Sequence, residues 1–245
     1  MSCATLAPPA AHEVHVWQWN LDVDDAELDR YRAMLSREEQ ERAGHFCFER
    51  HRRRFIAGRG QLRRLLGGYL ELAPQALTLA YGPEGKPFCA SQPNSPNGPD
   101  SPASWTLHFN LSHSENTAAL AISNGLEIGI DIERIRPFDE SMPVEVFAKR
   151  EREQFAALSD AQRQTIFFET WARKEACLKA LGTGFVLPPD HFEFDLSLRG
   201  DTTPRYVAGD ANEAAHWRVR ALTTIAGCAG AVAARHAAWS LVIKN

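Results

Sequence analysis

Apolar residues recur three or four positions apart along four stretches of the chain: residues 24–35, 49–70, 144–158 and 160–181. Side chains with this spacing share one face of an α-helix, so each stretch is predicted to be a helix with a buried side. Ser36 followed by Glu39 matches a capping box and predicts a further helix start. Gly182 directly follows the last stretch and is expected to end that helix.

Shorter apolar runs, several of them alternating with polar residues, predict β-strands. They cover residues 14–19, 77–81, 106–111, 117–122, 127–133, 191–198, 216–222, 228–233 and 239–243. Asn124 and Gly125 separate two of these strands, and this dipeptide is a strong signal for a tight hairpin turn. The mixture of helices and strands assigns the chain to the α+β class.

Residues 91–104 differ from the rest because proline recurs about every third position and no large non-proline apolar side chain is present. This composition predicts a solvated loop, for which a surface insertion is favoured over a functional lid. The loop divides the chain into residues 1–104, an N-terminal α+β half with a basic helix, and residues 105–245, a C-terminal α+β half.

Composition narrows the functional classes. The 245 residues are 44% hydrophobic and 24% charged, with a net charge of −4, which is typical of a globular protein and argues against nucleic-acid binding. No apolar run reaches the length of a membrane span, and no secretory signal is visible. The five scattered cysteines favour free thiols in a reducing cytoplasm. We therefore expect a cytoplasmic protein that binds neither membranes nor nucleic acid.

Asp131 and Glu133 interrupt the apolar strand at residues 127–133. Side chains alternate along a strand, so these two carboxylates are predicted to point to the same side. Acids in a half-buried strand need polar partners or a cation. A structural salt bridge is the alternative explanation for this pair taken alone.

Trp171, Glu175 and Lys179 follow one another at intervals of four residues on the predicted helix at residues 160–181. They therefore lie on one helical face. Taken alone, Glu175 and Lys179 have the spacing of an ordinary surface ion pair. Combined with the strand carboxylates, they form the set that a magnesium-assisted reaction at a phosphate ester requires.

The two segments resemble the paired signatures of the surfactin-synthetase-activating (Sfp) type of 4'-phosphopantetheinyl transferase, Gly-x-Asp-x-Glu followed by Trp-x-x-Lys-Glu-x-x-x-Lys. Both patterns occur in full, at residues 129–133 and 171–179. Residues 109–114 resemble the Asn-x-Ser-His-Ser segment of that family, and residues 85–88 resemble its Gly-Lys-Pro segment. Residues 42–58 resemble its basic helical region more loosely.

This resemblance implies two similar α+β subdomains related by a pseudo-twofold, with the active site between them. It implies transfer of the 4'-phosphopantetheine arm of coenzyme A to a serine of an apo acyl or peptidyl carrier protein. The products would be the holo carrier protein and 3',5'-ADP. Mg²⁺ is the implied cofactor, coenzyme A the substrate, and a cytoplasmic monomer the expected state.

The resemblance also implies roles for individual residues. Asp131, Glu133 and Glu175 match the magnesium ligands, and Glu175 is also a candidate general base for the carrier serine. Lys179 is expected to contact the transferring phosphate and stabilise its charge. Lys174 points to a different helical face, where a structural role or a contact with the carrier is expected.

A second group of residues matches positions that contact coenzyme A. Together with Lys179, this group comprises Arg42, His45, Arg54, Lys86, Pro87, Ser112 and His113. Arginine binds phosphate bidentately, which suits the 3'-phosphate of coenzyme A. His45 stands where the family more often has arginine or lysine.

Three other functions remain as alternatives: a magnesium-dependent phosphohydrolase, a non-catalytic carrier-protein binding module, and a nucleic-acid binding module. The phosphohydrolase would explain the carboxylates but would not require Trp171, Lys179 or the Gly-Lys-Pro segment. Fatty-acid, polyketide and nonribosomal-peptide carriers all stay open as partners.

Overall fold

The computed structural model describes the chain except for residues 1–4, 91–105, 138, 140–141, 183–186 and 245. The loop predicted at residues 91–104 therefore lies outside the described residues. The α-helices are α1 (Asp25–Arg32), α2 (Arg37–Gly44), α3 (Glu49–Leu70), α4 (Lys149–Ala156), α5 (Asp160–Leu181) and α6 (Ala211–Ala215). Short 3-10 turns lie at η1 (Pro74–Ala76), η2 (Val144–Val146) and η4 (Pro189–His191).

The strands are β1 (Glu13–Asn20), β2 (Leu79–Tyr81), β3 (Pro87–Cys89), β4 (Leu107–Ser114), β5 (Thr117–Asn124), β6 (Ile128–Arg134), β7 (Phe192–Glu193), β8 (Tyr206–Val207), β9 (Arg218–Ala221), β10 (Cys228–Ala234) and β11 (Ser240–Lys244). Most strands follow one another in two runs, β2 to β6 after α3 and β7 to β11 after α5, and the second run is interrupted by α6. The α+β assignment is confirmed.

Local signals in the sequence account for the helix ends. The predicted capping box is present at the start of α2, where Ser36 and Glu39 each bind the other's backbone. Gly182 ends α5 in the left-handed conformation, with φ of 68°. The two 22-residue helices, α3 and α5, match their predicted ranges. The predicted helix at residues 144–158 is instead a 3-10 turn followed by the shorter α4.

Two main sheets form the centre of the molecule. The first has the strand order β11-β1-β5-β4, with β1 parallel to β11 and antiparallel to β5. The second has the order β6-β10-β9 and is antiparallel. Two small hairpins, β2–β3 and β7–β8, lie outside them. The chain's last described strand thus completes the sheet that its first strand begins.

The predicted hairpin across Asn124 and Gly125 is wrong. β5 pairs with β1 and β4, whereas β6 pairs with β10, so this turn carries the chain from one sheet to the other. A type I′ hairpin needs positive φ at both turn residues, and here Gly125 has a φ of 73° while Asn124 is not in that region. The actual hairpin joins β4 to β5 through Glu115 and Asn116, with Glu115 at a φ of 51°.

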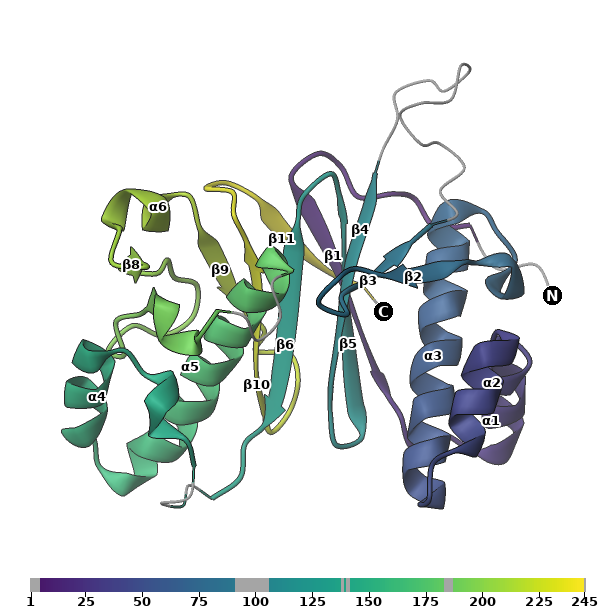
Figure 1. Cartoon of the computed structure of the whole chain (residues 1–245), viewed down its shortest axis with the longest axis horizontal. Helices are drawn as coiled ribbons and strands as arrows, with labels where there is room; N and C mark the ends of the chain where they lie inside the picture. The colour runs from purple at the N-terminus through teal and green to yellow at the C-terminus, as the bar shows by residue number, and fades with distance from the viewer. Residues whose placement is uncertain (1–4, 91–105, 138, 140–141, 183–186, 245) are drawn as a thin grey trace.

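The layers run helix, sheet, sheet, helix (Figure 1), with α1–α3 outside the first sheet and α5 outside the second. A core of small and β-branched side chains lies between the sheets and includes Val14, Val16, Ile130 and Val232. Separate apolar clusters lie under α3 and under α5. Strand β6, at the edge of the second sheet, is therefore covered on both faces, which is why acids within it need specific partners.

The division at residue 104 stays a prediction, as does the pseudo-twofold. Sheet membership changes further along the chain, because β4 and β5 join the sheet that contains β1. The strand predicted at residues 191–198 is mostly irregular, and only β7 forms there. Within the described residues, none of the helices combines the length and apolar character needed to cross a lipid bilayer.

Candidate active site

The centre of the candidate site is the contact between α5 and β6, two elements that pack directly on each other. Gly129 makes this approach feasible. A Cβ atom at that position would overlap the carbonyl oxygen of Ala176 and the backbone nitrogen of Ala180. The glycine of the Gly-x-Asp-x-Glu segment thus lets the helix that carries Glu175 and Lys179 lie against the strand that carries Asp131.

A ladder of side chains joins β4 to β6, although the two strands belong to different sheets. Every second residue of β4 contributes a side-chain oxygen that accepts a hydrogen bond from a backbone N–H of β6. The pairs, from acceptor to donor, are Asn110 to Ile130 at 2.8 Å, Ser112 to Ile132 at 3.3 Å and Ser114 to Arg134 at 2.9 Å. This ladder satisfies the buried N–H groups of Ile130 and Ile132 and the exposed one of Arg134, and it fixes the position of the strand.

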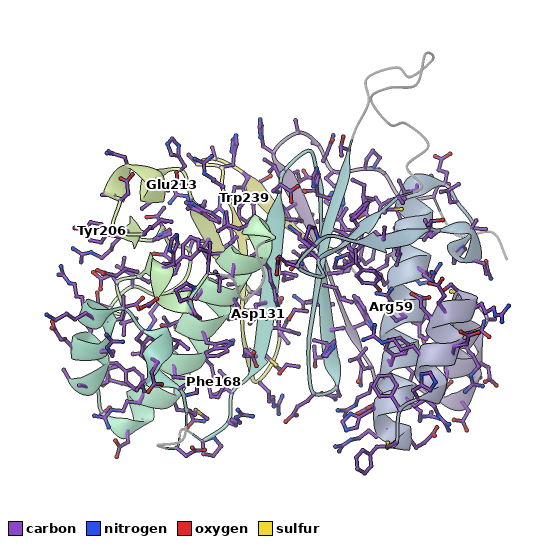
Figure 2. The ribbon with its side chains drawn as sticks, in the orientation of Figure 1. Arg59, Asp131, Phe168, Tyr206, Glu213 and Trp239 are labelled. Atoms are coloured by element: carbon purple, nitrogen blue, oxygen red, sulfur yellow. The ribbon has the colours of Figure 1, made fainter. Side chains whose placement is uncertain are left out.

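Asp131 lies at the middle of this junction (Figure 2) and is only 3% exposed. Its Oδ1 accepts hydrogen bonds from Ser112 at 2.9 Å and from the Lys179 ammonium at 2.6 Å. Its Oδ2 is buried and has no hydrogen-bond partner. Burial outweighs the attraction of Lys179 and raises the pKa of Asp131.

Glu133 and Glu175 complete a group of three interacting carboxylates. Burial, followed by the charge of Asp131, raises the pKa of Glu133 to about 7. Burial and the charge of Asp131 also raise the pKa of Glu175. The Oε1 atom of Glu175 is buried without a hydrogen-bond partner. Ser114 approaches Glu133 at 3.5 Å. The group therefore concentrates negative charge that lacks sufficient positive partners.

These carboxylates fit a hard divalent cation in their chemistry. Oxygen ligands are those that Mg²⁺ prefers, and the unpartnered Oδ2 of Asp131 and Oε1 of Glu175 are available to bind one. As the side chains stand, the described part of the chain has no group of three His, Cys, Asp or Glu gathered as a metal site. Lys179 supplies the positive charge that contacts Asp131 instead.

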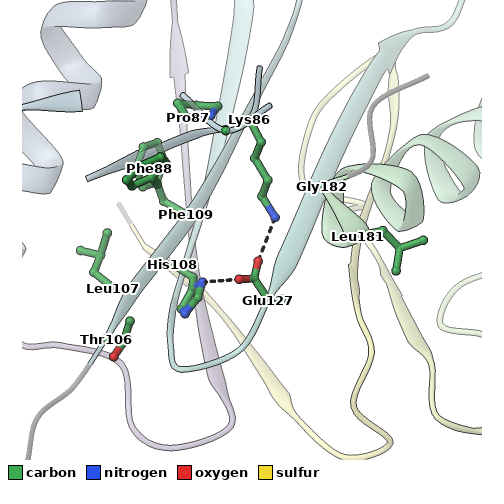
Figure 3. A pocket seen from close by; sticks show the side chains of 11 residues that line it. Lys86, Pro87, Phe88, Thr106, Leu107, His108, Phe109, Glu127, Leu181 and Gly182 are labelled. Carbon is green, nitrogen blue, oxygen red and sulfur yellow. Dashed lines mark hydrogen bonds and ion pairs between the residues drawn. The ribbon is translucent and has the colours of Figure 1, made fainter. Parts of the chain in front are cut away.

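A cavity of about 560 Å³ opens at the other end of β6. Lys86 and Pro87, both predicted to contact coenzyme A, line this cavity together with Phe88, Phe109 and Leu181 (Figure 3). The cavity has apolar walls and a small number of polar groups, which is typical of sites for small organic ligands.

The remaining predicted contacts with coenzyme A are separated. Ser112 and His113 are neighbours on a strand, so Ser112 faces β6 while His113 points to the opposite side and is exposed. Arg54 forms a bidentate pair with Asp22 at 2.6 and 2.7 Å. Arg42 covers the ring of Phe55 at 5.4 Å, and His45 is exposed at the end of α2. The basic residues lie in the N-terminal half and stay predictions as ligand contacts.

Lys174 is fully buried, which excludes the predicted alternative of a carrier contact and leaves a structural role. Its ammonium lies 2.7 Å from Glu151, and both side chains have an exposed fraction of 0%. It also donates to the carbonyl oxygens of Pro189 and Phe192. Lys174 therefore ties α5 to α4 and to the segment that follows α5.

Sequence reasoning missed several residues that shape the site. Asn110 and Ser114 lie within the segment that resembles Asn-x-Ser-His-Ser, but no role was predicted for them. Their spacing of two residues from Ser112 was the signal that could have revealed the ladder. His108 and Glu127 line the cavity and bind each other at 3.1 Å. Their positions just outside the matched motifs gave no signal, because they come together only in the folded chain.

Comparison with known families matches nearly the whole chain in two parts. Residues 18–125 match the family described as 4'-phosphopantetheinyl transferase, N-terminal. Residues 127–235 match the 4'-phosphopantetheinyl transferase superfamily. The two matches meet at the turn that carries the chain from β5 to β6.

Individual relatives agree with these matches. A protein of Nostoc sp. named 4'-phosphopantetheinyl transferase HetI is 44% identical over 174 residues, which are 70% of this chain and 70% of the relative. The human L-aminoadipate-semialdehyde dehydrogenase-phosphopantetheinyl transferase is 30% identical over 80% of this chain, which spans 59% of that relative. A 4'-phosphopantetheinyl transferase of Bacillus subtilis is 28% identical over 71% of this chain and 72% of its own length.

Proposed function

Because this chain belongs to the 4'-phosphopantetheinyl transferase superfamily, we infer that it transfers the 4'-phosphopantetheine arm of coenzyme A to a serine of an apo carrier protein. The enzyme is a transferase that acts on a carrier protein and uses coenzyme A as the second substrate. Neither phosphate-ester hydrolysis nor a non-catalytic binding role is favoured by these relationships.

The transfer exchanges one phosphorus–oxygen bond for another. The carrier serine oxygen forms a bond to the phosphorus that bears the pantetheine, and the bond from that phosphorus to the bridging oxygen of the pyrophosphate breaks. The electron pair leaves with 3',5'-ADP, and the serine proton passes to a base. We assign that base to Glu175, because burial raises its pKa and its unpartnered Oε1 is open to accept a proton.

Lys179 is placed to stabilise charge on the reacting phosphate. Its ammonium contacts Asp131 and Ser112 at 2.6 and 3.3 Å, and its side chain remains 30% exposed, so it can also reach a ligand. A positive group held beside the developing negative charge lowers the barrier because it needs no reorganisation during the reaction. The contacts with Asp131 and Ser112 keep this ammonium oriented.

Asp131, Glu133 and Glu175 are the residues that we propose to hold Mg²⁺. When bound, the cation would neutralise the pyrophosphate and the leaving group. The ladder from Asn110, Ser112 and Ser114 positions the strand that carries the first two ligands.

The single observation that carries the site assignment is the group of three carboxylates beside Lys179, in which burial and then the charge of Asp131 raise the pKa of Glu133 and of Glu175. A structural ion-pair network would match each carboxylate with a cation and would leave no buried carboxylate oxygen unpartnered. Excess buried negative charge is instead the arrangement expected of a cation site.

Three finer features belong to this proposal. Within the superfamily we place the chain with the Sfp type, because both full signatures and the Asn-x-Ser-His-Ser and Gly-Lys-Pro segments are present. The scattered cysteines support a cytoplasmic location, and Cys47, Cys177 and Cys228 are free thiols. We expect a monomer.

The test uses the purified full-length protein with coenzyme A, Mg²⁺ and an apo carrier protein, with mass spectrometry of the carrier. We expect the carrier to gain one phosphopantetheine group and 3',5'-ADP to appear in equal amount. A panel of fatty-acid, polyketide and peptide carriers would identify the preferred partner. Release of 3',5'-ADP without modification of any carrier would contradict transfer and favour hydrolysis.

A further inference from the structure

The cavity beside Lys86 contains an ionised carboxylate that belongs to neither recognised motif. Glu127 precedes β6 and extends into the cavity between Lys86 and His108 (Figure 3). The hydrogen bond from His108 and the charge of Lys86 together lower the pKa of Glu127 to about 2. The carboxylate is therefore ionised at neutral pH and can only accept hydrogen bonds.

Glu127 retains unused acceptor positions. His108 Nδ1 contacts its Oε1 at 3.1 Å, and Lys86 Nζ contacts its Oε2 at 3.1 Å. A carboxylate has about four lone-pair positions, so about two remain for a ligand. The side chain is 63% exposed, which leaves those positions accessible from the cavity.

The hydrogens of Lys86 and of His108 Nδ1 are already used in contacts within the protein. The Lys86 ammonium has three hydrogens, and it donates to Glu127, to the carbonyl oxygen of Ile128 and to that of Ala180, at 3.1, 3.1 and 3.2 Å. Because His108 Nδ1 faces a carboxylate, we assign a hydrogen to that nitrogen, and this hydrogen is used in the contact with Glu127. The open positions of the ionised Glu127 carboxylate therefore select a ligand group that donates.

Apolar walls beside this edge suit a flat ring. Phe88, Phe109, Leu107 and Leu181 line the same cavity.

Glu127 is four residues from Asp131 along an extended chain, which corresponds to roughly 13 Å at about 3.3 Å per residue. The ribose and the diphosphate of a nucleotide can span this separation, so a base in the cavity is compatible with a pyrophosphate beside Asp131.

We propose that Glu127, oriented by His108, selects the adenine base of coenzyme A by accepting a hydrogen bond from the 6-amino group. A base with a 6-oxo group would place an acceptor against this acceptor edge and leave both groups unpaired. The inference rests on the proposed function, because it takes coenzyme A as the ligand.

The test compares two nucleotides that lack the pantetheine arm, adenosine 3',5'-bisphosphate and inosine 3',5'-bisphosphate, by titration calorimetry on the full chain. The wild type is expected to bind the adenosine form about tenfold more tightly, which corresponds to about 1.4 kcal/mol. In Glu127→Gln the amide can donate to a 6-oxo group, so the ratio should fall below about twofold. Glu84→Gln is the matched control, because it removes an exposed carboxylate of the β2–β3 hairpin that carries Lys86 and should keep the tenfold ratio.

Each outcome decides the proposal. A ratio that falls in Glu127→Gln and stays in Glu84→Gln, with unchanged melting temperatures, supports it. Equal binding of both nucleotides by the wild type overturns it, as does failure to bind either one. A ratio preserved in Glu127→Gln also overturns it, even if both affinities drop. Carrier modification by the wild type, measured separately, shows whether the proposed function itself stands.

Discussion

Replacing Lys174 by methionine is expected to destabilise the fold strongly, while Asp131, Glu133 and Glu175 of the candidate site stay unchanged. Lys174 and Glu151 are both fully buried, and their charged atoms are 2.7 Å apart. Burial lowers the pKa of Lys174 and raises that of Glu151, so each ion depends on the other to remain charged. Methionine keeps most of the side-chain volume but leaves the Glu151 carboxylate without its cation.

The expected loss can be estimated from the contacts that remain. Removing one partner of a buried pair typically costs about 3–5 kcal/mol. Glu151 would still accept hydrogen bonds from the backbone N–H groups of Ala148 and Phe194, at 2.6 and 2.7 Å, which places the loss at the lower end, about 3 kcal/mol. For a chain of this size, that corresponds to a melting temperature lower by about 6–12 °C.

Urea unfolding of the single variants Lys174→Met and Glu151→Gln and of the double variant measures this coupling. We expect the double variant to lose less than the sum of the single losses, because neutralising both partners leaves no unpaired ion. The stability lost in Lys174→Met should also depend on pH. The folded-state pKa of Glu151 is raised, so the loss in Lys174→Met should be smaller at pH 5, where protonation is easier, than at pH 8.

Additive losses, or a loss below about 1 kcal/mol in Lys174→Met, would refute this reasoning. Arg37→Ala is the control. Arg37 pairs with Glu41 four residues further along α2, and 92% of its side chain is exposed, so this variant removes an ion pair at the surface. That variant should unfold at the wild-type urea concentration. A comparable loss there would mean that surface charge, rather than the buried pair, determines the effect.

Three further variants address the candidate site. Asp131→Ala should abolish carrier modification, since the proposed cation loses a ligand and the pyrophosphate its counter-ion, while circular dichroism stays unchanged; full activity in limiting Mg²⁺ would contradict this assignment. Glu175→Gln should lower the transfer rate about 10²–10⁴-fold with little change in coenzyme A affinity by calorimetry, whereas near-normal turnover would exclude Glu175 as both base and ligand. Burial and the Asp131 charge raise the pKa of Glu133 from 4.5 to about 7, so protonation stabilises the fold below pH 4.5 and this stabilisation is lost as the pH rises through 7. Glu133→Gln, measured in EDTA, should therefore melt higher than the wild type above pH 7, by about 2–4 °C after allowance for partial exposure, and equally below pH 4.5. A difference that does not change with pH would be inconsistent with this cause.

Local features of the chain could be predicted from the sequence because they depend on neighbours in the sequence. The periods of apolar residues located α3 and α5, and Gly182 and the Ser36 capping box marked helix ends. The spacing of Asp131 and Glu133 on a strand, and of Glu175 and Lys179 on a helix, likewise follows from backbone geometry. These features were sufficient to recognise the family and to predict Asp131, Glu133 and Glu175 as magnesium ligands.

Contacts between distant segments were decided only by the tertiary structure. Asn124 and Gly125 specify a turn, but which strands then pair depends on the packing of whole sheets, and β6 pairs with β10 rather than β5. Gly129 owes its role to the helix that packs against it, and Lys174 owes its burial to α4 and the segment after α5. The residues that surround Gly129 and Lys174 in the folded chain are not determined by their neighbours in the sequence.

The same distinction applies to the charges of the site. The sequence by itself determined that carboxylates and a lysine would be present, and that each pair would share a face. The tertiary structure brought Lys179 to Asp131 and left Glu175 with an unpartnered oxygen. It also directed Lys86 to Glu127 and two backbone carbonyl groups. Hydrogen bonds and pKa values depend on distance and burial in three dimensions, which spacing along the chain does not specify.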